Sequence, residues 1–104
     1  MATTPVPVSA EKTVTTAGTA VPLVASKTLV ASYSLRAKAA NTGQIYIGDS
    51  SVDDTINDGY DDGEGESWAA HGKWHFVDLA GIYIDSDEDG EGVELRYTPH
   101  SPNA

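Results

Sequence analysis

The clearest pattern in the chain is the alternation of apolar and polar residues over positions 28–38. Leu29, Tyr33 and Leu35 fall on one face of an extended strand, together with two alanines, while Val30 and Arg36 fall on the other face with two serines and a lysine. A period of two residues is typical of a strand with one buried face. The pattern therefore predicts a half-buried β-strand over residues 28–38.

Shorter strands are predicted where β-branched and aromatic residues lie next to turn residues. These strands cover residues 44–48, 67–70, 74–77, 81–86 and 92–98. The acidic, glycine-bearing stretch 49–66 has few apolar residues and is expected to be a long loop. Since no segment has a 3.6-residue period, the pattern favours an all-β sandwich or barrel.

The N-terminal part is rich in Thr, Ala, Pro and Val, and Pro5 and Pro7 disfavour helix. We expect residues 1–18 to form an extended arm rather than a packed element, either frayed or laid across a neighbouring subunit. The length of 104 residues is typical of one domain, which is predicted over residues 19–99, with residues 100–104 as a C-terminal tail. Neither a signal peptide nor a membrane-spanning segment is expected.

The stretch DSDEDGEGVE, residues 85–94, raises the question of a metal site. Asp85, Asp87 and Asp89 match the first half of a calcium-binding loop. A complete EF-hand loop needs a bidentate Glu at its twelfth position, which is Arg96 here. An EF-hand is therefore excluded, while a weak calcium site at the three aspartates is kept as an alternative.

A β-hairpin explains the same stretch better. The Asp-Gly pair at 89–90 is a strong signal for a two-residue type I′ turn. With this turn at the tip, Ile84 would lie opposite Leu95 on an apolar face, and Asp85 would lie opposite Glu94 on the outer face. The pattern therefore predicts an acidic, solvent-exposed hairpin.

Charge is strongly divided along the chain. Residues 1–48 contain four basic residues and one acidic residue, a balance of +3, whereas residues 49–104 contain two basic and fifteen acidic residues, a balance of −13. The acidic part would be repelled by nucleic acid and by anionic membranes, so neither is expected as a partner. The division indicates either a solvated acidic face or a polarised molecule that docks through one side.

Motifs for catalysis are missing from the sequence. It contains no cysteine and no nucleophile elbow, phosphate-binding loop or dinucleotide-binding motif. The carboxylates lie in polar, glycine-rich runs rather than in an apolar pocket that would raise a pKa. We expect no enzyme and no cofactor apart from weakly bound calcium. Trp68, Trp74 and Tyr60 are explained either by packing or by an aromatic platform for a sugar or a partner chain.

Four segments carry a resemblance to a known group of proteins. They are TTAGTAVPL, NTGQIYIGDSSV, GES and IYIDSDEDGEGVELRY, in this order. Over roughly residues 13–98 the chain resembles small bacteriophage virion structural proteins, which include head decoration (cement) proteins. Such proteins often have a Leu-Pro-Gly-like step before GES, where this chain has acidic and glycine residues.

The resemblance implies a single compact β-sandwich, jelly-roll-like, with an extended N-terminal arm. It implies a capsid decoration protein, made in the host cytoplasm, that binds the major capsid protein on the outer surface of the expanded head as a homotrimer. The candidate contact residues are Pro5, Val6, Pro7, Val8, Lys12, Lys27, Arg36 and Lys38. The alternative is a small glycan- or calcium-binding module for host-surface adhesion, in a tail or fibre.

Overall fold

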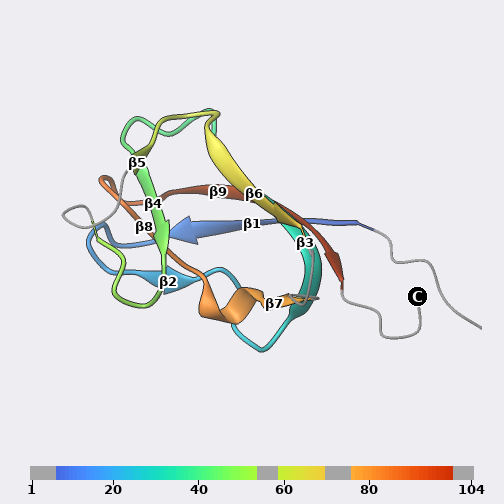
Figure 1. Ribbon diagram of the computed structural model, residues 1–104. Helices are drawn as coiled ribbons and strands as arrows, with labels where there is room; N and C mark the ends of the chain where they lie inside the picture. The colour runs from blue at the N-terminus through green and yellow to red at the C-terminus, as the bar shows by residue number, and fades with distance from the viewer. Residues whose placement is uncertain (1–6, 54–58, 70–75, 100–104) are drawn as a thin grey trace, which may run out of the picture.

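Two antiparallel β-sheets are formed by the residues that the structure, a computed structural model, describes: 7–53, 59–69 and 76–99 (Figure 1). Sheet A has the strand order β1-β9-β3-β6, with β7 also paired to β3, and sheet B has the order β2-β8-β4-β5. The bounds are β1 Val8–Val14, β2 Val21–Pro22, β3 Leu29–Ala37, β4 Ile45–Gly48, β5 Gly59–Tyr60, β6 Gly65–Ala69, β7 Val77–Asp78, η1 Leu79–Gly81, β8 Tyr83–Ser86 and β9 Glu91–Pro99. Within these residues there is no α-helix, and no helix that is long and apolar enough to cross a membrane. The prediction of an all-β sandwich is confirmed, and its jelly-roll refinement stays a prediction.

The core lies between the two sheets and receives side chains from both. Leu35 of β3 lies directly opposite Leu95 of β9 in sheet A, and Ile45 and Ile84 come from sheet B. Each of these four is at most 2% exposed. Burying one such side chain stabilises the fold by about 1.5–3 kcal/mol.

Most of the predicted strands are found within one or two residues of their expected places. The strands predicted over 28–38, 44–48 and 92–98 correspond to β3, β4 and β9, and the one predicted over 67–70 begins two residues earlier, as β6. Of the strand predicted over 74–77, the first two residues lie outside the described part. The strand predicted over 81–86 begins only at Tyr83, because Leu79–Gly81 form a 3₁₀ turn capped by Asp78.

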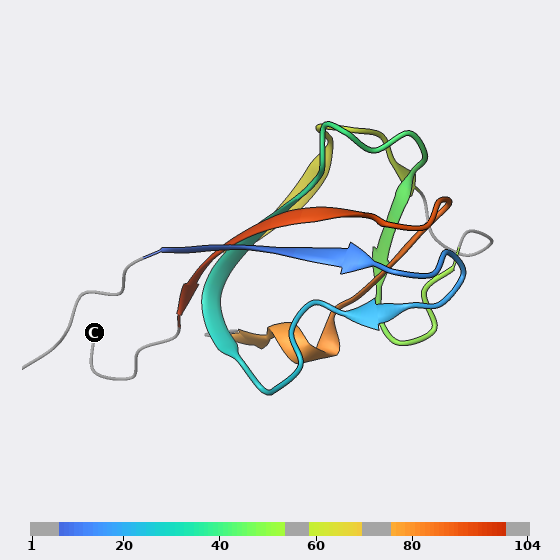
Figure 2. The same ribbon diagram turned by 180° about the vertical axis from the view of Figure 1, so that it is seen from behind.

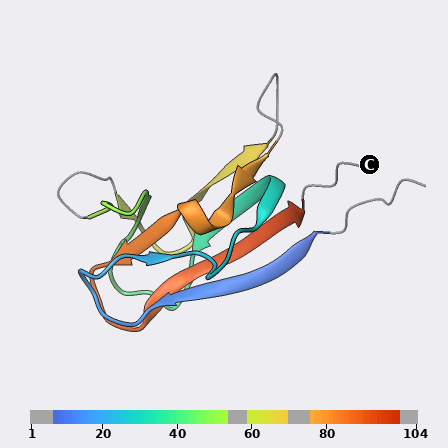
Figure 3. The same ribbon diagram turned by 90° about the horizontal axis from the view of Figure 1, so that it is seen from below.

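The N-terminal region differs from its prediction. Val8–Val14 is not an unpacked arm but the edge strand β1, which pairs with β9 along its whole length, from Val8 opposite Tyr97 to Val14 opposite Glu91 (Figure 3). Extended backbone was predicted correctly, but packing was not. Val14, fully buried, fixes the end of this strand in the core.

The predicted hairpin is wrong. β8 lies in sheet B and β9 in sheet A, so residues 87–90 carry the chain from one sheet to the other (Figure 2). A type I′ turn needs positive φ at both central residues. Gly90 has a φ of 82°, but no described residue other than glycine has a positive φ, which excludes Asp89. Ile84 therefore lies opposite Val21 and Ile47 instead of Leu95.

Candidate functional site

The acidic crossover, residues 85–91, fastens loops from other parts of the chain. Asp85 Oδ1 accepts hydrogen bonds from the backbone N–H groups of Gly18 (2.9 Å) and Ser86 (2.8 Å). Asp89 Oδ1 accepts one from the N–H of Ala17 at 2.7 Å. These two carboxylates thus hold the loop between β1 and β2.

Two further carboxylates of the crossover, those of Asp87 and Glu91, hold the turn before β4. Asp87 accepts hydrogen bonds from the N–H of Gln44 (3.1 Å) and from the Tyr46 hydroxyl (2.8 Å). Glu91 accepts them from the N–H and Oγ1 of Thr42 and from the N–H of Gly43, the last at 2.9 Å. Burial raises the pKa of Glu91, but these hydrogen bonds outweigh burial, and the net pKa is below its ordinary value.

This arrangement does not make a metal centre. Asp85, Asp87 and Asp89 each bind backbone or hydroxyl donors from the neighbouring loops. The described residues contain no group of three or more His, Cys, Asp or Glu side chains that could hold a metal ion. The three aspartates of the calcium alternative are therefore not brought together as ligands.

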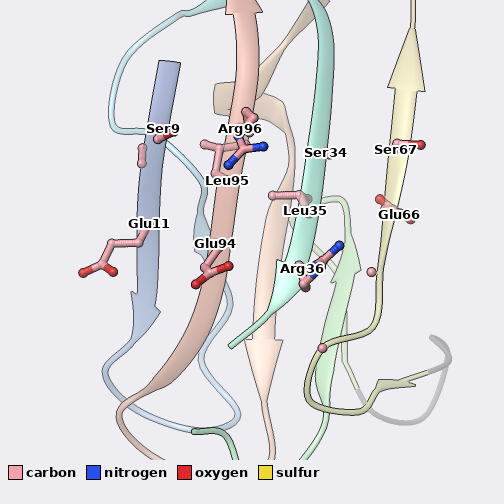
Figure 4. A pocket seen from close by; sticks show the side chains of 13 residues that line it. Ser9, Glu11, Ser34, Leu35, Arg36, Glu66, Ser67, Glu94, Leu95 and Arg96 are labelled. Atoms are coloured by element: carbon pink, nitrogen blue, oxygen red, sulfur yellow. The ribbon is translucent and has the colours of Figure 1, made fainter. Parts of the chain in front are cut away.

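The outer face of sheet A, the face turned away from the core, is hollow and polar. Figure 4 shows this hollow, which has a volume of about 670 Å³. Strand register arranges its side chains in two rows that run across the four strands. The first row is Ser9, Arg96, Ser34 and Ser67, and the second is Glu11, Glu94, Arg36 and Gly65. The positions that alternate with these rows include Leu35 and Leu95 of the core.

Three positively charged side chains lie on or beside this outer face, next to the carboxylates of Glu11 and Glu94. The chain has six Lys and Arg residues, and Arg36, Arg96 and Lys38 lie on the face or at its border. Lys38 Nζ forms an ion pair with Glu11 Oε2 at 3.1 Å. Among the described residues neither arginine forms an ion pair, and both are exposed. Two guanidinium groups are thus available to a partner.

The structure separates the predicted contact residues. Arg36 and Lys38 lie together, but Lys12 is half-buried opposite Val93, on the core side of β1, and Lys27 lies in the connection before β3. Of the N-terminal candidates, Pro7 and Val8 are exposed at the start of β1, whereas Pro5 and Val6 lie outside the described residues. The predicted set did not include Arg96, although its polar position between apolar neighbours in the last strand was a signal.

An aromatic cluster lies around Glu66, which also borders the hollow. The rings of Tyr33 and Trp68 stack with centroids 6.2 Å apart, and the Tyr60 hydroxyl donates to Glu66 Oε2 at 3.0 Å. We call Tyr33, Tyr60, Glu66 and Trp68 the flank cluster. Two of the three predicted aromatic contact residues thus lie around Glu66, while Trp74 lies outside the described residues.

Comparisons with models of known protein families, with curated proteins and with solved structures found no match. The likeness to phage virion proteins therefore depends on the four sequence segments.

Proposed function

We propose that this chain is a bacteriophage capsid decoration protein that docks on the expanded head through the outer face of sheet A. The observation that carries the proposal is that Arg36 and Arg96, both exposed and without an ion pair among the described residues, lie on one polar face of a chain with a net charge of −10. A guanidinium binds a carboxylate through two parallel hydrogen bonds, so these arginines suit an acidic protein surface.

The small side chains of this face favour close approach by a partner. Ser9, Ser34 and Ser67 supply hydroxyl groups that both donate and accept hydrogen bonds. Gly65 has no side chain to cover the edge of the sheet. A Cβ at this position would lie 1.7 Å from the Leu35 carbonyl oxygen. Such a surface matches a polar, hydrated interface rather than an apolar one.

The proposed role is mechanical. A protein that binds only the expanded shell stabilises that state by mass action. A homotrimer that bridges neighbouring capsomers, as the resemblance implies, would add interface area that must break before the shell opens. Native mass spectrometry of the purified protein tests the trimer directly.

Co-sedimentation with expanded heads that lack the protein tests the docking face. Arg36→Glu and Arg96→Glu should each weaken binding by at least about tenfold, the scale of one lost charge-assisted pair. Lys27→Glu is the matched control, because it changes the charge equally at an exposed residue away from this face. If all three variants bind equally weakly, net charge and not this face governs docking.

A deletion that tests the N-terminal residues has to end before β1 begins. Removing residues 2–12 would delete most of β1 and its pairing with β9. Removing residues 2–6 spares that strand. Weaker co-sedimentation of this variant, with an unchanged melting temperature, is the expected result if Pro5 and Val6 contact the shell.

A further inference from the structure

A carboxylate and three aromatic residues converge between the sheets on the β5–β6 side of the sandwich. Glu66 and Trp68 are two positions apart on β6 and share a face of sheet A, and Trp68 lies opposite Tyr33 on β3. Tyr60 comes from sheet B, where it lies opposite the fully buried Ile45. Its hydroxyl reaches Glu66 Oε2 at 3.0 Å and so links the two sheets.

The cluster is compact and open to solvent. The Tyr33 and Trp68 rings are 6.2 Å apart and inclined by only 19°. Burial raises the pKa of Tyr33, and the nearby carboxylate of Glu66 raises it further, so that carboxylate is felt at the Tyr33 hydroxyl. All four residues are partly exposed, which leaves the cluster accessible to a ligand.

Glu66 keeps unused capacity to accept hydrogen bonds. A carboxylate has about four acceptor positions, and the Tyr60 hydroxyl occupies one of them. Within the described residues no Lys or Arg pairs with Glu66, since the ion pair found there joins Lys38 to Glu11. A carboxylate that has no cationic partner among these residues therefore lies beside stacked aromatic rings.

We propose that the flank cluster binds the guanidinium group of an arginine side chain from a partner protein. Glu66 would accept two charge-assisted hydrogen bonds, and the guanidinium plane would stack on the Trp68 ring. The chain's net charge of −10 also attracts cationic partners. A sugar ring would use the aromatic faces equally well, but it carries no charge to match that of Glu66.

Tryptophan fluorescence offers a direct test. The chain has two tryptophans, so Trp74→Phe makes Trp68 the single reporter. N-acetylarginine amide and N-acetylcitrulline amide would be titrated at constant ionic strength, because citrulline has nearly the same shape without the charge. We expect saturable binding of the arginine compound, about fivefold or more tighter than that of citrulline. Methyl α-glucoside serves as the sugar probe.

Two further variants locate the interaction. Glu66→Gln should reduce arginine affinity to the citrulline level, while Glu94→Gln, with the same charge change on the opposite face of sheet A, should leave it unchanged. Melting temperatures would confirm that both variants are folded. Equal binding of arginine and citrulline, no saturable binding, or binding of the glucoside alone would overturn the proposal. These small probes involve no shell, so their failure leaves docking through the outer face untouched.

Discussion

Replacing Glu91 with glutamine tests whether the acidic crossover stabilises the fold. The Glu91 side chain is buried, and its two oxygens accept hydrogen bonds from the backbone N–H groups of Thr42 and Gly43. Glutamine keeps one acceptor oxygen but turns its amide N–H₂ toward the second donor. Since a hydrogen bond to a charged group contributes about 1.5–3 kcal/mol, we expect Glu91→Gln to lower the free energy of unfolding by about 2–3 kcal/mol.

The pH dependence of the free energy of unfolding provides a second, independent test of this prediction. The pKa of Glu91 in the folded chain is below its ordinary value of 4.5, so the unfolded chain binds the proton more readily. Its contribution is therefore fully present above about pH 4.5 and is lost as the pH falls through the folded pKa. Glutamine does not titrate, so the difference between wild type and variant should shrink under acid conditions.

Urea denaturation followed by circular dichroism, at pH 7 and near pH 3, measures both effects. At pH 7 the variant should also melt roughly 10–20 °C lower, given the usual relation for a domain of this size. Glu88→Gln is the control, because Glu88 is exposed and its carboxylate accepts no hydrogen bond from the described residues. A loss below about 0.5 kcal/mol, or a loss of equal size at both pH values, would refute this account of the hydrogen bonds.

Three other outcomes follow from the structure. Gly65→Ala should lower the free energy of unfolding by about 1–3 kcal/mol or more, because the added Cβ would lie 1.7 Å from the Leu35 carbonyl oxygen; wild-type stability in urea would contradict this close approach. Lys38→Met should cost less than about 1 kcal/mol, because its ion pair with Glu11 is partly solvated, and a larger loss in the same assay would show that the pair is more than a surface contact. Millimolar calcium should not raise the melting temperature relative to a chelator, because the crossover carboxylates already bind donors of the protein; a calcium-dependent rise would mean that they rearrange around the ion.

The strands with strong alternation were predictable from the sequence. In β3 and β9 the apolar positions alternate with polar ones, and Leu35 and Leu95 are buried as expected. Val30, predicted on the polar face, is instead fully buried, because the register of β3 with β9 shifts between Val30 and Ser32. β1 was missed because the core-side positions of this edge strand include Lys12 and the exposed Val8, and only its last residue, Val14, is fully buried. Its position depends on β9, which lies more than 70 residues later in the chain.

The path of residues 85–94 was not predictable for a related reason. Alternation in the two flanking segments is satisfied equally by a hairpin and by a crossing between sheets. Which of the two paths the chain takes depends on distant strands, since Ile84 of β8 pairs with Val21 of β2 and Ile47 of β4. The candidate surface could be predicted in part from the sequence. Arg36 and Lys38 were predicted contacts, but their grouping with Arg96 follows from the register of β3 with β9.

The place of β9 in sheet A has a consequence for the synthesis of this protein. β9 is the last strand of the chain, yet it lies between β1, the first strand, and β3. Until residues 91–99 have left the ribosome, β1 has no neighbour in the sheet, and β3 lacks β9 as a neighbour. Sheet A therefore stays incomplete until residues 91–99 have been synthesised. A message truncated before β9 would release a chain with two unpaired strand edges, a target for degradation or aggregation rather than a smaller folded protein.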